Sequence, residues 1–304
     1  MTFGSQMTIT AKIIADSISP QGVRLTTFEL EYPRIIHAEV MTHRVLSRNA
    51  QSSRAIPLSK SLTFETYEPQ HWGKNKSGMS SDEPLDEQSK RECQYYWNAL
   101  VRYTQDFCKR MSDAGLHKQW ANRPLEWHSH IKVVVTATEW DNFFWLRIDP
   151  DAAQPEVVEL ATKMQEAMGI SQPQLLQPGE WHLPYVTTHQ KSRGVGYFLL
   201  EEDGDYFEVD LETAKKVSAA SCAAVSYRNT PSVEKCLEIW DRLFSGPKPH
   251  LSPVEHQAAP MATIPIRDGI EYLKTWEDGI THVTKDGQLW SANFRGWIQL
   301  RQVI

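Results

Sequence analysis

The segment from Thr8 to Tyr32 most constrains what this chain can fold into. Apolar and polar residues alternate along it on both sides of a Pro-Gln-Gly break at residues 20–22. That pattern is typical of two strands joined by a tight turn. We therefore expect two antiparallel strands at the start of the chain.

Helical patterns follow. Segments with apolar residues at helical spacing lie at 34–46, 87–114, 155–167, 211–225 and 233–244. The run from Ile131 to Arg147 begins with β-branched residues, which favour a buried strand or turn, and ends with aromatic residues, which suggest a helix. Periodicity alone does not decide such short apolar runs. A hairpin is expected at Glu201–Asp205, and strand and helix signals run from Thr281 to Gln302.

These patterns predict one α+β domain over residues 1–304, with an antiparallel sheet packed against long helices. Segments at about 60–90 and 170–210 interrupt this pattern and are expected to be insertions. The first contains the Gly-, Ser- and Asp-rich stretch 70–86, and the second contains the Pro-rich stretch 172–184. A polar loop is expected at 47–59. We find no tandem repeat and no linker long enough to divide the chain.

Composition excludes several classes of function. The chain has 304 residues, 40% hydrophobic and 23% charged, which is enough for a core without disulfides or metal. It has no run of about 18 apolar residues and no signal-peptide pattern, so we expect a cytoplasmic protein with no membrane contact. The four cysteines show no CxxC spacing, which argues against a metal or redox motif. A net charge of −6 argues against a nucleic-acid polymer as partner, whereas a single nucleotide needs only a few arginines.

The densest polar cluster runs from Thr42 to Arg54, where four basic residues alternate with hydroxyl and amide side chains. The planar donor fork of arginine suits a phosphate or a uracil oxygen. The same composition also fits a solvated loop after a helix, because a helix C-terminus favours basic residues. Composition alone leaves both interpretations open.

Arg147 directly follows the apolar residues 143–146. Burying it requires an anionic partner or hydrogen bonds, so it either reaches solvent or holds a ligand. Asp149 and Asp151 are natural salt-bridge partners, which is the competing interpretation.

His250 and His256, with Glu255 beside them, have side chains that can bind a metal. No third ligand has suitable spacing, and Pro253 disfavours a helix that would align them. We predict no metal site.

Several blocks together resemble the flavin-dependent thymidylate synthases. The family signature is Arg-His-Arg, seven residues, then Ser, with Arg two positions later, and it stands here as Thr42-His43-Arg44, Ser52 and Arg54. The block Asn-x-x-x-Leu-Arg before Ala-Gln-x-Glu matches Asn142, Leu146 and Arg147, then Ala153, Gln154 and Glu156. The arginine of the block Ala-Arg-x-x-Leu-Pro best matches Arg123.

The order of blocks and several residues depart from the family. The segments Val225–Arg228 (VSYR) and Ser252–His256 (SPVEH) follow the signature, whereas their counterparts precede it in the family, so the chain resembles a circular permutation. The substituted positions are Glu39 for Gln, Thr42 for Arg, Ala50 for Glu, Ser53 for Gly and Ala55 for Tyr.

The resemblance implies transfer of a one-carbon unit from methylenetetrahydrofolate to the uracil ring of dUMP, giving dTMP. It implies FAD as cofactor, NADPH as reductant and a homotetramer that builds each site from several subunits. In such enzymes reduced flavin relays the one-carbon unit and supplies a hydride, which fits a chain with no cysteine in these blocks. A related flavin-dependent methylase or hydroxymethylase of another pyrimidine nucleotide, and a non-catalytic nucleotide-binding homologue, are the alternatives.

The resemblance also assigns residues. Arg147 and Ser52 are the expected catalytic residues, Arg147 by polarising the uracil. The expected nucleotide-binding residues are Glu39, Gln51, Ser52, Ser53, Arg54, Arg123 and Arg147. The expected flavin-binding residues are His43, Arg44, Asn142, Leu146, Ser252 and His256.

Overall fold

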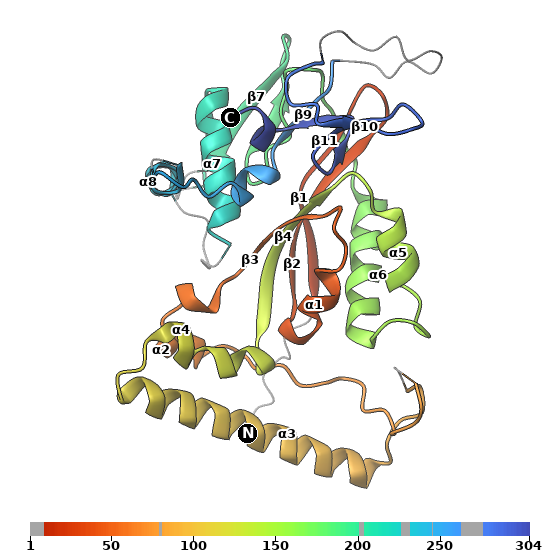
Figure 1. Cartoon of the computed structure of the whole chain (residues 1–304), viewed down its shortest axis with the longest axis vertical. Helices are drawn as coiled ribbons and strands as arrows, with labels where there is room; N and C mark the ends of the chain where they lie inside the picture. The colour runs from red at the N-terminus through yellow and green to blue at the C-terminus, as the bar shows by residue number, and fades with distance from the viewer. Residues whose placement is uncertain (1–8, 79–80, 201–203, 226–231, 245, 263–275) are drawn as a thin grey trace.

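A computed structural model of the chain describes residues 9–78, 81–200, 204–225, 232–244, 246–262 and 276–304. They form a mixed α+β structure around one five-stranded sheet, in agreement with the predicted fold class (Figure 1). The sheet order is β3-β4-β2-β1-β5, with bounds Ser47–Ala50, His130–Ala137, Arg24–Pro33, Thr10–Ile18 and Gln174–Leu175. β5 runs parallel to β1, and the other neighbouring pairs of this sheet are antiparallel.

The predicted hairpin is confirmed in β1 and β2, which pair from Thr10↔Glu31 to Ile18↔Arg24. Gly22 lies in the turn with a φ of 79°, a conformation that glycine adopts without a steric penalty. Its N–H donates to the Ser19 carbonyl at 2.9 Å.

Two helices cover one face of the sheet, α5 (Asp141–Arg147) and α6 (Pro155–Ile170) (Figure 1). The apolar run from Ile131 to Arg147 thus forms a strand, β4, and then a helix, α5, so both interpretations of its sequence hold for one part of it. The strand part lacks an alternation of apolar and polar residues because both faces of β4 are buried. The largest core cluster includes Phe28, Leu30, Val133, Val135, Phe143, Val157 and Leu160.

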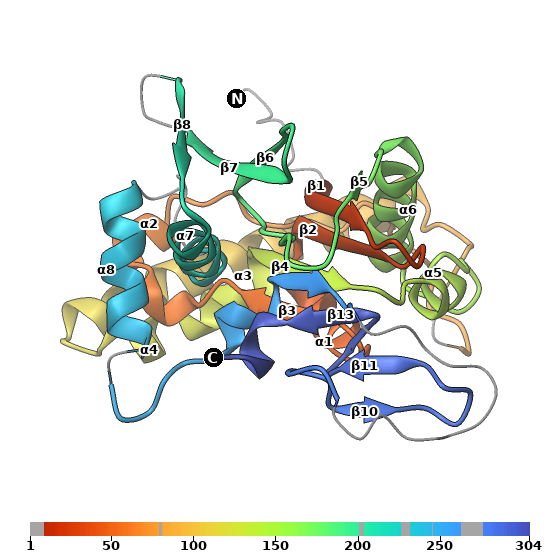
Figure 2. The ribbon, with the colours of Figure 1, turned by 90° about the horizontal axis from the view of Figure 1, so that it is seen from above.

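On the other side of the sheet lie α7 (Leu211–Ala223) and α8 (Val233–Phe244), with a small antiparallel sheet of β6 (Thr187–Gln190), β7 (Val195–Leu200) and β8 (Tyr206–Val209). Figure 2 shows the helix pairs on opposite sides of the strands. The pairing of β7 with β8 agrees with the predicted hairpin, of which residues 201–203 lie outside the described residues. Val134 of β4 packs against Cys222 of α7, on the face opposite Val133 and Val135.

The C-terminal part contributes short strands near the start of β3. β9 (Ala258–Pro260) pairs with β13 (Trp297–Gln299), while β10 (His282–Val283), β11 (Leu289–Ser291) and β12 (Phe294–Arg295) form a separate sheet. The 3-10 helices η4 (Ser252–Glu255) and η5 (Leu300–Gln302) flank these strands.

The long helix α3 (Glu87–Asp113) lies across one end of the molecule (Figure 1). Its predicted range of 87–114 is confirmed to within one residue. The Asp86 side chain accepts hydrogen bonds from the backbone N–H groups of Gln88 and Ser89, which caps its N-terminus. Short helices accompany it, namely α2 (Leu58–Ser61), η2 (Ser53–Ala55), α4 (Lys118–Ala121) and η3 (Arg123–His128). Among the described residues, no helix is both long and apolar enough to cross a membrane.

The predicted helix over 34–46 and the predicted loop from residue 47 both differ from the structure. Residues 34–46 form η1 (Arg34–Ile36), the single turn α1 (His37–Val40) and a turn, and the chain then enters β3. Arg48 of β3 donates to the carbonyls of Met41 and His43, at 2.7 and 3.2 Å, which satisfies groups that a longer helix would have paired internally.

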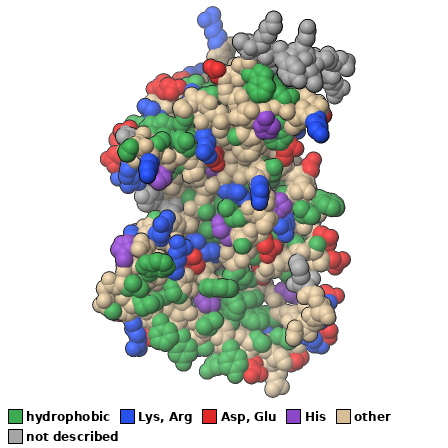
Figure 3. Space-filling model, viewed as in Figure 1, with side chains coloured by type: hydrophobic (Ala, Val, Ile, Leu, Met, Phe, Trp, Pro, Cys, Tyr) green, Lys and Arg blue, Asp and Glu red, His purple; other side chains and the backbone are tan. Residues whose placement is uncertain are grey.

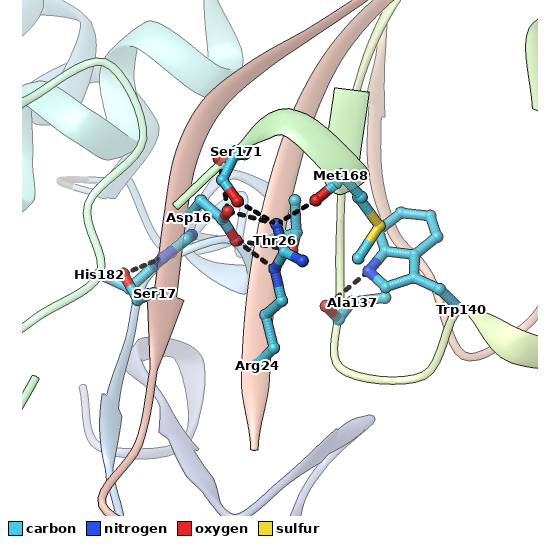
Figure 4. A network of polar contacts seen from close by, with 9 residues as sticks. All are labelled: Asp16, Ser17, Arg24, Thr26, Ala137, Trp140, Met168, Ser171 and His182. Carbon is cyan, nitrogen blue, oxygen red and sulfur yellow. Dashed lines mark hydrogen bonds and ion pairs between the residues drawn. The ribbon is translucent and has the colours of Figure 1, made fainter. Parts of the chain in front are cut away.

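A polar network fastens the β1–β2 hairpin to the end of α6 (Figure 4). The buried Asp16 carboxylate accepts hydrogen bonds from Arg24, Thr26 and Ser171, at 2.6–2.9 Å. Arg24 also donates to the Met168 carbonyl at 2.9 Å. The pair is therefore a structural connection between sheet and helix.

Candidate functional site

Arg147, at the C-terminal end of α5, reaches the turn that follows α1. Its Nε donates to His43 Nε2 at 2.9 Å, and one terminal nitrogen donates to Thr42 Oγ1 at 3.1 Å. Its other terminal nitrogen lies 3.5 Å from a Glu39 carboxylate oxygen. Four residues of two predicted sequence blocks therefore form one contact cluster, which we call the Arg147 cluster.

His43 is the buried member of this cluster, at 7% exposure, and packs edge-on against the Phe143 ring at 4.9 Å. Burial first, and then the positive charges of Arg147 and Arg48, lower the pKa of His43. The ring is therefore neutral near pH 7. Because its Nε2 accepts from Arg147, the proton lies on Nδ1.

Arg147 does form an ion pair, but its partner is neither Asp149 nor Asp151. Asp149 accepts a hydrogen bond from the backbone N–H of Asp151, and the acidic partner of Arg147 is Glu39. Arg147 is only 18% exposed. Among the described residues these three partners use fewer N–H donors than the guanidinium carries, so donors remain for a ligand.

A second group of arginines lines a pocket of about 510 Å³ beside this cluster. The lining residues are Arg44, Leu46, Arg48, Glu255, Ala292, Asn293, Gln299, Arg301 and Gln302. Its volume lies within the usual range for small-molecule sites. Three guanidinium groups face one carboxylate, so the pocket is positive although the whole chain is negative. We call it the arginine pocket.

His256 is fully buried against the central sheet. Its Nδ1 shares a hydrogen bond of 2.8 Å with Thr136, which contacts Thr27 at 2.8 Å, and Thr27 contacts His182 at 2.8 Å. His182 in turn bonds Ser17 at 2.9 Å (Figure 4). Burial lowers the pKa of both histidines to about 3, so both are neutral. The predicted flavin-binding His256 thus ends a buried polar chain across the sheet.

The expected nucleotide loop, Gln51 to Arg54, lies at the far end of β3. Gln51 exchanges hydrogen bonds with the backbone of Lys132, which extends the strand pairing by one residue. Asn122 donates to the carbonyls of Ser53 and Ile56, at 2.8 Å each, and so fixes the turn that follows. Arg54 is exposed.

Beneath this loop lies a small cavity of about 40 Å³, lined in part by Arg34, Ser53, Asn122, His128 and His130. Each of these side chains has a buried polar atom without a hydrogen-bond partner in the described part of the chain. A cavity of this size with several polar groups has room for a water molecule.

Arg123 does not line the small cavity or the arginine pocket. It is exposed and donates a hydrogen bond to Glu126 at 3.0 Å. Its neighbour Asn122, which the sequence did not single out, is the residue that contacts the loop. The signal that could have found it was its position next to Arg123.

The other expected flavin-binding residues, Asn142, Leu146 and Ser252, are exposed. Of the VSYR segment, only Val225 lies within the described residues. No group of three potential metal ligands occurs among the described residues. The sequence did not single out Gln299 and Arg301 as pocket residues, although both lie in the segment from Thr281 to Gln302 where strand and helix signals were expected.

Comparison with known proteins bears on these groups. The family model described as thymidylate synthase complementing protein matches residues 17–174, which is 158 of the 304 residues. This range contains the Arg147 cluster and the Gln51–Arg54 loop, while the VSYR and SPVEH segments lie outside it. The permuted order therefore stays a prediction. No curated protein matches the chain.

Two solved structures of a UMP/dUMP methylase from Streptomyces cacaoi show some similarity. The form bound with 5-Br UMP has a TM-score of 0.46 at 16% identity, covering 54% of this chain and 90% of that one. The form bound with 5-Br dUMP has a TM-score of 0.45 at 15% identity, covering 54% and 91%.

Proposed function

Because this chain belongs to the family of thymidylate synthase complementing proteins, we propose that it methylates the uracil ring of dUMP to give dTMP. Methylenetetrahydrofolate supplies the carbon, FAD is the cofactor and NADPH is the reductant. The observation that carries the proposal is the Arg147 cluster, since the two sequence blocks that match the family meet there through direct hydrogen bonds.

Arg147 is the proposed uracil-polarising residue. Its remaining N–H donors can bind a ring carbonyl, and a neutral His43 fixes the guanidinium plane without adding a competing charge. Ser52 stays the second proposed catalytic residue, and Gln51, Ser53, Arg54 and Arg123 stay proposed nucleotide ligands together with Glu39. Within one subunit these ligands lie at both ends of β3.

The arginine pocket fits the phosphates of a flavin dinucleotide. Arg44 and Arg48 offer charged donors, and Arg44 is exposed at the pocket. When bound, reduced flavin supplies the electrons for the one-carbon transfer. Asn142, Leu146, Ser252 and His256 stay proposed flavin contacts. The protein's own contribution is to hold, orient and shield the reacting groups.

The proposed homotetramer is supported by α3. Its side chains Tyr96, Leu100, Tyr103 and Phe107 recur at helical spacing and are each more than half exposed. Figure 3 shows apolar side chains gathered at the end of the molecule where α3 lies. An apolar stripe of this kind on a long helix is typical of subunit contacts. Light scattering that shows a monomer with full turnover would contradict this part of the proposal.

Glu39 favours a second candidate, methylation or hydroxymethylation of another pyrimidine nucleotide. Its carboxylate accepts hydrogen bonds only, so beside Arg147 it suits the amino group of a cytosine ring, which uracil lacks. A parallel assay with UMP, dCMP and dUMP, read by mass spectrometry of the products, separates the two. A chain that consumes none of them, with flavin bound, is a non-catalytic homologue.

The decisive experiment replaces Arg147 by Lys and by Leu and measures dTMP formation at saturating dUMP. Lysine keeps the charge but loses the planar fork, so turnover should fall about thirtyfold, equivalent to about 2 kcal/mol of transition-state stabilisation. Arg110→Lys, in an exposed ion pair on α3, is the matched control. If Arg147→Lys turns over like wild type while Arg147→Leu merely melts earlier, Arg147 is part of the scaffold.

A further inference from the structure

The arginine pocket has two walls from distant parts of the chain. Arg44 and Arg48 lie on the first wall, inside the range that matches the family. The second wall comes from residues 292–302, which lie outside that range. The family match therefore explains one wall and leaves the other without an assigned role.

Hydrogen bonds fix the second wall to the first. Asn293 donates to the Val45 carbonyl at 2.9 Å and to Ser47 Oγ at 3.0 Å. Gln299 donates to Asn293 Oδ1 at 3.0 Å and to the Glu255 carbonyl at 3.1 Å. The C-terminal segment is thus held in a defined position at the start of β3.

One buried atom of this wall has no hydrogen-bond partner among the residues that the structure describes. Gln299 is fully buried, and its Oε1 accepts no hydrogen bond within the described part of the chain. Buried acceptors are seldom left without a donor. Since Gln299 lines the pocket, an N–H or O–H donor from a ligand can satisfy this oxygen.

Charge identifies the kind of ligand. Arg44, Arg48 and Arg301 face the single carboxylate of Glu255, which pairs with Arg301. Guanidinium groups on both walls suit a ligand with two linked phosphates better than a single phosphate, because each wall can bind one of them. A nucleotide also brings the hydroxyl donors that the Gln299 oxygen lacks.

We propose that the C-terminal segment 292–302 is a binding element for a diphosphate-containing nucleotide, with Arg301 as its charged ligand and Gln299 as its hydrogen-bond acceptor. When a phosphate binds, Arg301 exchanges part of its ion pair with Glu255 for a contact with the phosphate. The inference rests on the proposed function only in taking FAD as the dinucleotide.

Calorimetric titration with FAD, inorganic pyrophosphate and dUMP tests this on the full chain. Arg301→Gln should weaken the binding of FAD and pyrophosphate about tenfold, the loss of one charge-assisted contact, and leave dUMP unchanged. Arg295→Gln is the matched control, because Arg295 lies in the same segment and pairs with a carboxylate, that of Glu139, but does not line the pocket. It should change no affinity by more than about twofold.

Glu255→Gln provides a test of opposite sign that does not depend on the folding of the first variant. It removes the carboxylate that competes for Arg301, so pyrophosphate should bind about threefold more tightly. Unchanged affinities in both Arg301→Gln and Glu255→Gln would overturn the proposal, as would a loss confined to dUMP. A wild-type chain that binds none of the three probes overturns it as well. Pyrophosphate binding that depends on Arg301 in a chain that does not bind FAD supports the site and contradicts only the flavin part of the proposed function.

Discussion

Replacing Thr136 by Val tests the buried polar chain that ends at His256. The Thr136 hydroxyl contacts both Thr27 Oγ1 and His256 Nδ1 at 2.8 Å, and all three residues are fully buried. Valine has nearly the same shape without the hydroxyl. Thr27 keeps its contact with His182, but His256 loses the only hydrogen bond of its ring found among the described residues.

The expected loss of stability follows from this one missing hydrogen bond. A buried polar group left unpaired costs about 1–3 kcal/mol, so Thr136→Val should lower the free energy of unfolding by about 2 kcal/mol. For a chain of this size that corresponds to a fall of about 3 °C in the thermal midpoint. Circular dichroism melting at pH 7.5 measures it, with Thr10→Val on the exposed start of β1 as control. If both variants melt within about 1 °C of wild type, the buried hydrogen bonds that link Thr136 to His256 do not contribute to stability as argued.

Three further predictions concern stability. Burial lowers the pKa of His182 and His256 to about 3, so the unfolded state binds protons below pH 6.5 that the folded state does not. The free energy of unfolding should therefore fall as the pH is lowered from 6.5 to 3. Each of the two histidines contributes up to about 1.4 kcal/mol for every pH unit, and urea titrations across that range can measure the fall. Asp86→Ala removes the cap of α3 and should lower the urea midpoint of unfolding at pH 7. Asp16→Asn leaves Arg24 without its carboxylate and should cost about 3 kcal/mol in the same assay; a loss below about 1 kcal/mol would mean that water replaces the pair.

The fold was largely predictable because its long elements carry strong periodic patterns. α3 and α6 show apolar residues at helical spacing over several turns, and the β1–β2 pair alternates around a glycine turn. The segment 34–50 was not predictable in the same way. Its apolar residues fit a helix, but pairing of β3 with β4 and the contacts of Arg48 to two carbonyls are tertiary effects that local pattern does not contain.

The candidate site was predictable in its residue types and less so in its contacts. The meeting of His43 with Arg147 follows from the family blocks, whereas the choice of Glu39 over Asp149 as ion-pair partner depends on where α1 and α5 end. Gln299 and Arg301 carried no distinguishing pattern. Their role depends on a C-terminal segment folding back against the start of β3, about 250 residues away in the sequence.

Two departures from the family act on the same guanidinium group. Thr42 stands where the family has an arginine, and its hydroxyl accepts from Arg147 while donating to the Glu39 carbonyl at 2.6 Å. Glu39 stands where the family has a glutamine, and its carboxylate pairs with Arg147. Two positive charges in the family thus become one positive and one negative charge here, so the cluster is formally neutral and attracts an anion less strongly. We therefore expect the guanidinium groups of the arginine pocket to bind the negative charge of a phosphorylated ligand, and the Arg147 cluster to recognise an uncharged ring through directional hydrogen bonds.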